Sequence, residues 1–413
     1  MNGYLDTCNK EECFGCEACK QICPKNAIEM YTDKEGFRYP IIDIKKCINC
    51  GMCRKVCSYV NMPERYDDDK FAFGGYHKSY DVRDKSTSGG FFSAIVDNWC
   101  DENYIIFGAK AEGLEVFHSY IDDKKDLNVF RKSKYSQSKM GDSYKKAKEF
   151  LKHGKKVLFS GTPCQIAGLR TYLGKIDTTN LLTIEVICEG VPSPLYMRKY
   201  EEYIEKKYNA KIKQLDYRYT DLKNKRGKWD FEIMYTVLDN GKSIKKDRWF
   251  NPFWKIWLAH LMSRPSCYNC KFTNASRVAD ISLGDLWGVH LYCPELYGKN
   301  GGASLAVCNT IKGKEAFKAS IKDLYGHQLD FETALKYQSP MRKSISKNPD
   351  RDRFMNDLEN PEMTYKKIIS KWYSGPSLKL LWSKYVWGNR QKIFVWNIKN
   401  NLKRRDKNGK NND

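Results

Sequence analysis

Eight cysteines near the N-terminus have the spacing of iron–sulfur ligands. They form two runs of C-x2-C-x2-C-x3-C, and each cysteine of the first run lies 34 residues before its counterpart in the second. In chains that hold two 4Fe–4S clusters, the fourth cysteine of each such run binds the cluster of the other run. The spacing therefore predicts one cluster on Cys13, Cys16, Cys19 and Cys57, and a second cluster on Cys47, Cys50, Cys53 and Cys23.

The segment between the two runs must bring their loops together. Residues 27–31 and 37–42 have the composition of two strands separated by a turn, so we expect a hairpin there. A disulfide framework and a zinc site are the alternatives to the clusters. Zinc takes four ligands, and eight cysteines at this doubled spacing would be an unusual zinc protein.

Four later cysteines stand where a sheet could gather them. Cys164 and Cys188 each follow a predicted buried strand, and Cys267 and Cys270 form a C-x2-C pair. Because sites in α/β folds form at the edge where the strands end, we expect the four thiolates to share a third cluster. Zinc is an alternative occupant, and a role as small buried hydrophobic residues is another.

Two glycine-containing turns, at residues 87–90 and 161–163, precede predicted helices. Such a turn can present backbone N–H groups and the positive end of a helix dipole to an anion or to the edge of a polar ring. It can equally be a plain helix cap.

The predicted clusters also favour a particular organic cofactor. Clusters transfer one electron at a time, whereas most metabolites react by two electrons, and a flavin can do both. The clusters therefore favour a flavin, although no G-x-G-x-x-G fingerprint is present.

The elements around these residues predict an α+β protein. Strands at 71–76, 104–109, 156–160, 181–187 and 303–308 alternate with helices such as 91–99, 144–153 and 194–208. The fold class is a small two-cluster ferredoxin-like N-terminal domain, then a larger α/β flavin-binding core with an antiparallel β insertion at 211–250, then a helical C-terminal tail. The chain after residue 308 is expected to be helical. The predicted domains are 1–62, 71–330 and 331–413, with the polar stretch 61–70 as linker.

Length, composition and charge limit the cellular location, the number of domains and the kinds of partner that we expect. The chain has 413 residues and 16 cysteines, with no apolar leader in residues 1–10 and no apolar stretch of 18, so we expect a cytoplasmic protein of two or three domains. The formal net charge is +22, and residues 364–413 carry 13 basic against two acidic residues. This basic tail could contact an anionic membrane or could simply be solvated, and a nucleic-acid partner is not expected.

Several motifs together resemble the beta-subunit family of the coenzyme F-420-reducing hydrogenases and dehydrogenases, fused to a bacterial-type ferredoxin head. They lie at residues 86–92, 157–169, 188–194, 267–270 and 279–288. The resemblance implies a noncovalent FAD beside a 4Fe–4S cluster held by Cys164, Cys188, Cys267 and Cys270. It also implies flavin contacts from Thr87, Ser88, Gly89 and Gly90, with Gly161 and Thr162 nearby. The segment Tyr135–Ser138 matches a family segment, which makes Gln137 and Ser138 flavin or substrate contacts.

One departure concerns Glu189, because the family often has histidine between this cysteine and glycine. An anion there should lower a nearby redox potential or change the substrate. A deazaflavin is not carried over, since many relatives occur without it, often among genes for surface polysaccharide synthesis. The leading hypothesis is an iron–sulfur flavoprotein oxidoreductase that exchanges electrons between a redox protein or reduced cofactor and a small-molecule substrate. The alternative is a non-catalytic electron-relay or binding subunit. A homo-oligomer is compatible with both, and the motifs assign no catalytic residue.

Overall fold

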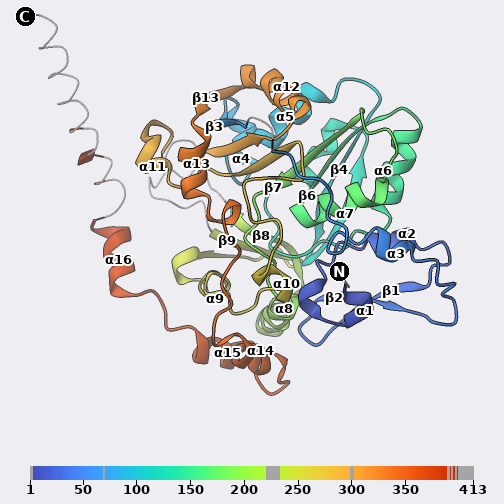
Figure 1. Ribbon diagram of the computed structural model, residues 1–413. Coiled ribbons are helices and arrows are strands. Elements are labelled where there is room, and N and C mark those ends of the chain that lie inside the picture. The colour runs from blue at the N-terminus through green and yellow to red at the C-terminus, as the bar shows by residue number, and fades with distance from the viewer. Residues whose placement is uncertain are drawn as a thin grey trace, which may run out of the picture.

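An eight-stranded mixed sheet forms the centre of the computed structural model (Figure 1). The structure describes residues 3–67, 70–219, 233–297 and 302–387, together with Gln391, Phe394, Val395 and Ile398. The strand order is β13-β3-β12-β11-β7-β6-β4-β5. The strands are β3 (Phe71–His77), β4 (Tyr104–Glu112), β5 (Glu115–Ile121), β6 (Lys156–Gly161), β7 (Leu181–Val186), β11 (Ile281–Asp285), β12 (Ser304–Cys308) and β13 (Leu324–Leu329).

Five strands of this sheet run in one direction. β4, β6, β7 and β11 pair parallel, and β3 has the same sense because β12 lies antiparallel between β11 and β3. The carboxyl ends of β3, β11, β7, β6 and β4 therefore share one edge, which is where α/β folds place their sites. This confirms the predicted strands and the α+β class.

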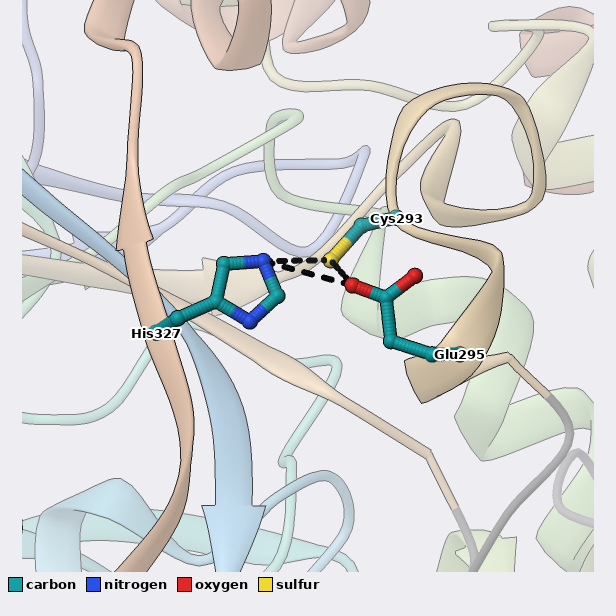
Figure 2. A group of neighbouring side chains, drawn as sticks. All are labelled: Cys293, Glu295 and His327. Atoms are coloured by element: carbon teal, nitrogen blue, oxygen red, sulfur yellow. Dashed lines mark hydrogen bonds and ion pairs between the residues drawn. The ribbon is translucent and has the colours of Figure 1, made fainter. Parts of the chain in front are cut away.

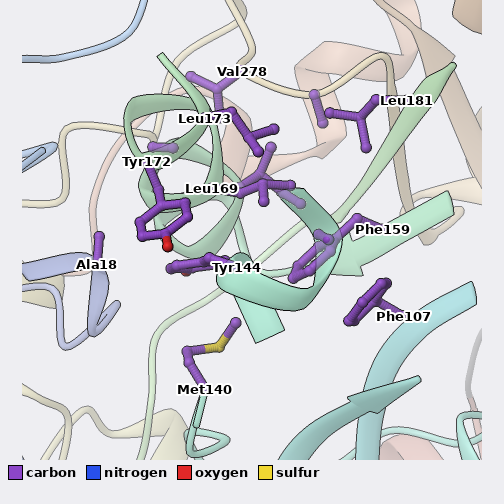
Figure 3. Close-up of a cluster of buried hydrophobic side chains, with 14 of the residues drawn as sticks. Ala18, Phe107, Met140, Tyr144, Phe159, Leu169, Tyr172, Leu173, Leu181 and Val278 are labelled. Carbon is purple, nitrogen blue, oxygen red and sulfur yellow. The ribbon is translucent and has the colours of Figure 1, made fainter. Parts of the chain in front are cut away.

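Helices cover both faces of the sheet because side chains along each strand alternate between them. Val157 and Phe159 face α6 (Ser143–Lys152) and α7 (Pro163–Leu173), and Figure 3 shows this cluster with Tyr144 and Leu169. Leu158 faces the opposite way, toward α5 (Phe91–Trp99) and α12 (Ile311–Ser320). All three strand residues are fully buried, which accounts for their continuous apolar run.

The cluster region lies against the α6–α7 face. It contains α1 (Tyr4–Thr7), α2 (Ala18–Ile22), β1 (Ile28–Thr32), β2 (Arg38–Ile42) and α3 (Met52–Lys55). The predicted hairpin is confirmed, because β1 and β2 pair antiparallel from Ile28↔Ile42 to Thr32↔Arg38. A Cβ placed on Gly168 of α7 would lie 3.0 Å from Cys16 Sγ, so the first cysteine loop packs directly on this helix. The expected linker is also attached to the core, where Arg65 donates to the Lys271 carbonyl at 2.7 Å.

The insertion is a second sheet of order β10-β9-β8, made of β8 (Ile212–Tyr219), β9 (Ile233–Leu238) and β10 (Ser243–Asp247). All its pairs are antiparallel, as predicted, although the expected start of the second strand at residues 231–232 lies outside the described residues. α8 (Pro194–Tyr208) and α9 (Pro252–Leu258) pack on it, and α10 (Pro265–Tyr268) follows.

The C-terminal part differs from the expected helical stretch in one respect. Residues 324–329 form the edge strand β13, which pairs on one side only. Its polar composition and Gly326 are not typical of a strand, so the sequence did not predict it. The other elements are the helices α4 (Tyr80–Asp84), α11 (Val289–Tyr292), α13 (Phe331–Tyr337), α14 (Arg351–Glu359), α15 (Tyr365–Trp372) and α16 (Leu378–Tyr385), and the 3₁₀ turns η1 (Lys10–Glu12), η2 (Lys124–Val129), η3 (Arg248–Phe250), η4 (Pro294–Leu296), η5 (Ile321–Asp323) and η6 (Ser339–Met341).

Only the end of the predicted tail stands away from the body. α14 and α15 share a hydrophobic cluster with α8 and α9, whereas α16 lies apart from the rest in Figure 1. Residues 399–413, with the basic end of the tail, lie outside the described residues. Among the helices that the structure describes, none combines the length and the apolar character needed to cross a membrane.

A buried ion pair joins α14 to the hairpin of the cluster region. Arg351 donates to both carboxylate oxygens of Glu35, at 3.1 and 2.7 Å, and both residues are buried. Replacing Arg351 with methionine leaves Glu35 as an uncompensated buried charge, so we expect a loss of about 3–5 kcal/mol. Anaerobic thermal unfolding should show this as an earlier loss of the cluster absorbance. The double variant with Glu35→Gln should recover much of the loss, and equal midpoints for the single variant and the parent would contradict the prediction.

Candidate functional site

The eight N-terminal cysteines surround two neighbouring cavities. The first cavity is lined by Cys13, Cys16, Cys19 and Cys57. The second cavity is lined by Cys23, Cys47 and Cys50, and Cys53 lines both. Each cavity thus collects three cysteines of one run and the last cysteine of the other, which is the crosswise grouping that the spacing predicts.

The four later cysteines surround a third cavity. Cys164, Cys188, Cys267 and Cys270 all line it. Cys164 lies in the first turn of α7 directly after β6, and Cys188 follows the parallel neighbour β7, so the sheet edge brings the two together. The C-x2-C pair arrives from α10 and the loop that follows it.

The donor chemistry of the third cavity fits a metal centre. Burial raises the pKa values of Cys164, Cys188 and Cys270 to about 11, so the bare thiols would keep their protons at neutral pH. Four thiols that share a cavity become ligands only when a metal displaces those protons, and all-thiolate sets select iron–sulfur clusters or zinc.

The third cavity adjoins the first. Phe14 lines both of them. Arg264, which is 1 % exposed, also lines the third cavity and donates from Nε to the Cys13 carbonyl at 3.0 Å. Its other nitrogens donate to Gln137 Oε1 and to the Arg38 carbonyl, each at 3.0 Å. Sequence reasoning missed Arg264, and its contact with Cys13 spans 251 residues, which leaves no local pattern to find.

The predicted flavin residues fall into two groups at the same sheet edge. Gly161 and Thr162 lie beside Cys164, and Gln165 connects Thr162 to Ser138, while Gln137 donates to the Phe14 carbonyl at 2.7 Å. Residues 87–90 instead follow β3, which β12, β11 and β7 separate from β6. The stretch between the two groups is the segment 133–138. Its Ser133 N–H donates to Thr87 Oγ1 at 2.8 Å, and its Gln137 side chain reaches Arg264.

The resemblance implies that the turn at 87–90 contacts the flavin, but two of its donors already have partners within the chain. The Gly89 N–H donates to Ser304 Oγ at 2.8 Å, and the Ser88 hydroxyl donates to the Ala303 carbonyl at 3.2 Å. Gly90 has φ +82°, a conformation that glycine adopts at little cost and that starts α5 here. The turn is therefore held against β12, and a ligand would have to use Thr87, the remaining N–H groups or a rearranged Ser88.

A buried histidine, which sequence reasoning missed, is linked to the core cysteines. Burial lowers the pKa of His118 on β5 to about 4, so the ring is neutral. Its Nε2–H donates to the Ser160 carbonyl at 2.9 Å, so Nδ1 accepts from Ser138 Oγ at 2.7 Å. Gln165 Nε2 donates to Ser138 at 2.8 Å, and its Oε1 accepts from the Thr162 N–H at 2.9 Å. Thr162 Oγ1 lies 3.1 Å from Cys164 Sγ, so the network ends at a predicted ligand.

A polar hollow of about 400 Å³ adjoins the turn at 87–90. Its charged side chains come from the end of α4 and the residue after it, from both sides of Ser133 and from the strand β8. Five are basic and two are carboxylates: Lys85, Arg131, Lys132, Lys134, Lys213, Asp84 and Asp216. Burial lowers the pKa of Lys134 to about 7. The hollow can attract anionic groups, and it was not predicted because its residues come from separate parts of the chain.

Glu189 lines the third cavity, so its effect on a cluster there can be tested. Burial raises the pKa of its carboxyl, and the charge of Arg248 opposes that rise. Glu189→Gln should raise the midpoint potential of the core centre by tens of millivolts, since 1.4 kcal/mol corresponds to about 60 mV for one electron. Redox titration followed by electron paramagnetic resonance measures the shift. Glu202→Gln, at an exposed position of α8 that lines none of the three cysteine cavities, is the control, and an unchanged potential in Glu189→Gln would refute the effect.

Comparisons with known proteins agree with this geometry. The family model for the C terminus of the coenzyme F420 hydrogenase/dehydrogenase beta subunit matches residues 154–330, and the 4Fe-4S dicluster domain matches residues 12–61. An uncharacterized ferredoxin of Methanocaldococcus jannaschii is 31 % identical over 68 residues, which are 15 % of this chain and 87 % of that protein. A second uncharacterized ferredoxin of that organism is 47 % identical over 47 residues, 11 % of this chain and 28 % of that protein.

A solved structure of the F420-reducing [NiFe] hydrogenase complex from Methanosarcina barkeri, derivatized with xenon, has a chain that is 16 % identical. The alignment covers 74 % of this chain and 92 % of that chain, with a TM-score of 0.41. The two family matches include both cysteine runs and all four later cysteines. Residues 154–330 belong to the family of the C terminus of the coenzyme F420 hydrogenase/dehydrogenase beta subunit. The chain carries an N-terminal 4Fe-4S dicluster domain and is an iron–sulfur protein of the electron-transfer kind.

Proposed function

We propose that the chain is an FAD-dependent iron–sulfur oxidoreductase with three 4Fe–4S clusters, acting on a small-molecule substrate in a reducing cytoplasm. The observation that carries this proposal is the row of three cysteine-lined cavities. Cys53 lines the first two, and Phe14 lines the first and the third. Electrons would enter at the cluster of Cys47, Cys50, Cys53 and Cys23, pass that of Cys13, Cys16, Cys19 and Cys57, and reach the core cluster. The unpaired state of all sixteen cysteines fits a reducing compartment.

The flavin would lie along the sheet edge beyond the core cysteines. Gln137, Ser138, Gly161 and Thr162 would contact it beside Cys164, and the turn at 87–90 would contact it at the far end. When bound, FAD would supply the exchange between one-electron and two-electron transfer. The basic hollow next to Thr87 would hold the anionic part of the flavin or the substrate. The neutral His118 would fix the orientation of Ser138, because its Nδ1 accepts the hydrogen bond that the Ser138 hydroxyl donates.

A second candidate function is a relay subunit without a flavin. The observation that favours it is the turn at 87–90, where Gly89 and Ser88 already donate to β12 and the residue before it. Such a subunit would pass electrons through its clusters to a partner protein, and the core would carry no substrate.

Iron and flavin counts distinguish the two. Protein purified without oxygen should hold about twelve irons and one releasable FAD per chain if the oxidoreductase is correct. Twelve irons without flavin, even after incubation with FAD, would support the relay. Iron near eight, with or without flavin, would reject the core cluster in both versions. A reductive titration in the visible range then shows whether the flavin bleaches together with the clusters.

The end of the chain is proposed as a contact for an anionic membrane, which would suit an enzyme of surface polysaccharide synthesis. On α16, Leu378 is 85 % and Trp382 is 61 % exposed, and the tail around them is basic. Deleting residues 376–413 should abolish co-sedimentation with vesicles that contain anionic lipid and leave the cluster spectrum intact. Equal binding by both forms would remove this role.

A further inference from the structure

Three side chains outside the proposed redox path converge at the edge of the large sheet (Figure 2). Cys293 follows α11 and is fully buried, Glu295 lies two residues later in η4, and His327 comes from the edge strand β13. Cys293 Sγ lies 3.2 Å from Glu295 Oε1 and 3.2 Å from His327 Nε2. His327 Nε2 and Glu295 Oε1 are 3.4 Å apart. The three donor atoms thus form a nearly equilateral triangle.

This triangle has the size of one face of a tetrahedral metal site. With bonds of about 2.3 Å to sulfur and about 2.0–2.1 Å to nitrogen and oxygen, tetrahedral ligand atoms lie roughly 3.4–3.6 Å from one another. The observed separations are within a few tenths of an ångström of that. Thiolate, imidazole and carboxylate are also the donor types that zinc and its neighbours in the first transition row accept. The exposure of the other two side chains, 48 % for His327 and 47 % for Glu295, leaves room for a fourth ligand from solvent.

We propose that Cys293, Glu295 and His327 bind a divalent transition cation, with Zn²⁺ as the first candidate and water as the fourth ligand. The site is separate from the twelve cysteines of the three cavities, none of which it shares. It lies next to the hydrophobic cluster of Tyr76 and Leu305, which joins the same edge of the sheet to the segment after β11.

The position suggests what the cation would do. It would fasten the segment 293–295 to β13, and the chain then returns through Ala303 and Ser304 into β12. These two residues accept hydrogen bonds from Ser88 and Gly89. A metal at Cys293 would thus fasten the segment 293–295 to the same sheet on which the proposed flavin turn rests, because β3 pairs with both β13 and β12. It would be a structural clamp with no part in electron transfer.

The test measures zinc and iron together in full-length protein purified without oxygen and with its clusters in place. Wild type should hold about one zinc per chain, and zinc absorption-edge spectroscopy should give one sulfur at about 2.3 Å with nitrogen and oxygen ligands at about 2.0–2.2 Å. His327→Gln and Cys293→Ser should lose the zinc and keep their iron. His153→Gln, on the exposed end of α6, and Cys308→Ala, a buried cysteine of β12, are the matched controls and should retain both metals.

Protein isolated without zinc is then titrated with Zn²⁺ alone. Wild type should bind one equivalent, and His327→Gln should bind it more than about 100-fold more weakly, since changes outside the ligand sphere alone cost roughly 10–100-fold. His327 is half-exposed, so this variant is expected to fold even if Cys293→Ser does not. Zinc that stays in His327→Gln, a spectrum with four sulfurs, or no binding by wild type would each overturn the proposal and leave a hydrogen-bonded trio.

Discussion

Replacing Cys188 with alanine is expected to remove four of the proposed twelve or so irons and to break electron transfer between the N-terminal clusters and the proposed flavin. The physical reason is the arrangement of the third cavity, where Cys188 is one of four cysteines and no other cysteine among the described residues lines it. A cluster that loses one of its four thiolate ligands here has no other cysteine in the cavity to replace it. Flavin reduction by a donor that acts through the N-terminal clusters should slow by at least about 100-fold, because the core cluster is the proposed intermediate step.

The measurements are iron per chain, electron paramagnetic resonance of the reduced protein, and stopped-flow flavin reduction. The N-terminal clusters should keep their signals, since Cys188 lines neither of their cavities. Cys308→Ala is the control, because it removes a buried cysteine of the large sheet that lines none of the three cavities. Retention of twelve irons by Cys188→Ala would contradict the assignment of this cysteine. A loss of iron in Cys308→Ala as well would point to a general folding defect.

Much of the local structure could be predicted because it depends on short-range patterns. The helix over 194–208 has the predicted bounds, since Pro194 at its first position and Ser193 as its cap fix its start. The strand at 156–160 is longer by one residue, and its unbroken apolar run is what two covered faces require. The cysteine groups follow from spacing, and the edge that joins Cys164 to Cys188 follows from the rule for parallel strands.

The remaining features depend on contacts between distant parts of the chain. His118 looks like one residue of an alternating strand, and only the fold brings Ser138 and Ser160 to its two nitrogens. β13 lacks the apolar alternation of a strand because it is an edge strand. The pattern of the turn at 87–90 fits both an anion-binding turn and a plain helix cap, and the strand that accepts from the Gly89 N–H lies 215 residues later. Sequence spacing locates a turn, whereas the partner of each donor is set by tertiary packing.

The same packing buries the charged guanidinium of Arg264 between two proposed clusters. Its guanidinium is buried, lies 4.3 Å from the centre of the Tyr39 ring, and donates to two backbone carbonyls and an amide oxygen. Among the described residues no carboxylate pairs with it. A buried charge without a partner is costly, so an opposite charge must lie nearby. The proposed clusters at Cys13 and Cys267 provide it, because thiolate-bound clusters are net negative and the Arg264 backbone and side chain contact both ligand segments.

Replacing Arg264 with methionine should therefore lower the midpoint potentials of both neighbouring clusters. At a separation of roughly 7 Å and an effective dielectric of about 20, one unit charge changes the energy of adding an electron by about 2 kcal/mol. That corresponds to about 100 mV for a one-electron couple. The shift is downward, because the positive charge stabilises the reduced and more negative state. The cluster of Cys47 should change less, since Arg264 donates to Cys13, a residue of the first cavity, but to no residue that lines the second cavity.

A redox titration followed by electron paramagnetic resonance, on protein with its full iron content, measures these shifts. Arg264→Lys is the control variant, because lysine keeps the charge but cannot make all three hydrogen bonds of the planar guanidinium. Arg264→Lys should keep the midpoint potentials of the clusters close to those of the parent protein and should lower the free energy of unfolding. If Arg264→Met binds too little iron to titrate, Arg264→Lys and Arg264→Gln, both polar, still separate charge from packing. Equal potentials in the lysine and the uncharged variants would show that Arg264 supports the loops mechanically and does not set the potentials of the clusters.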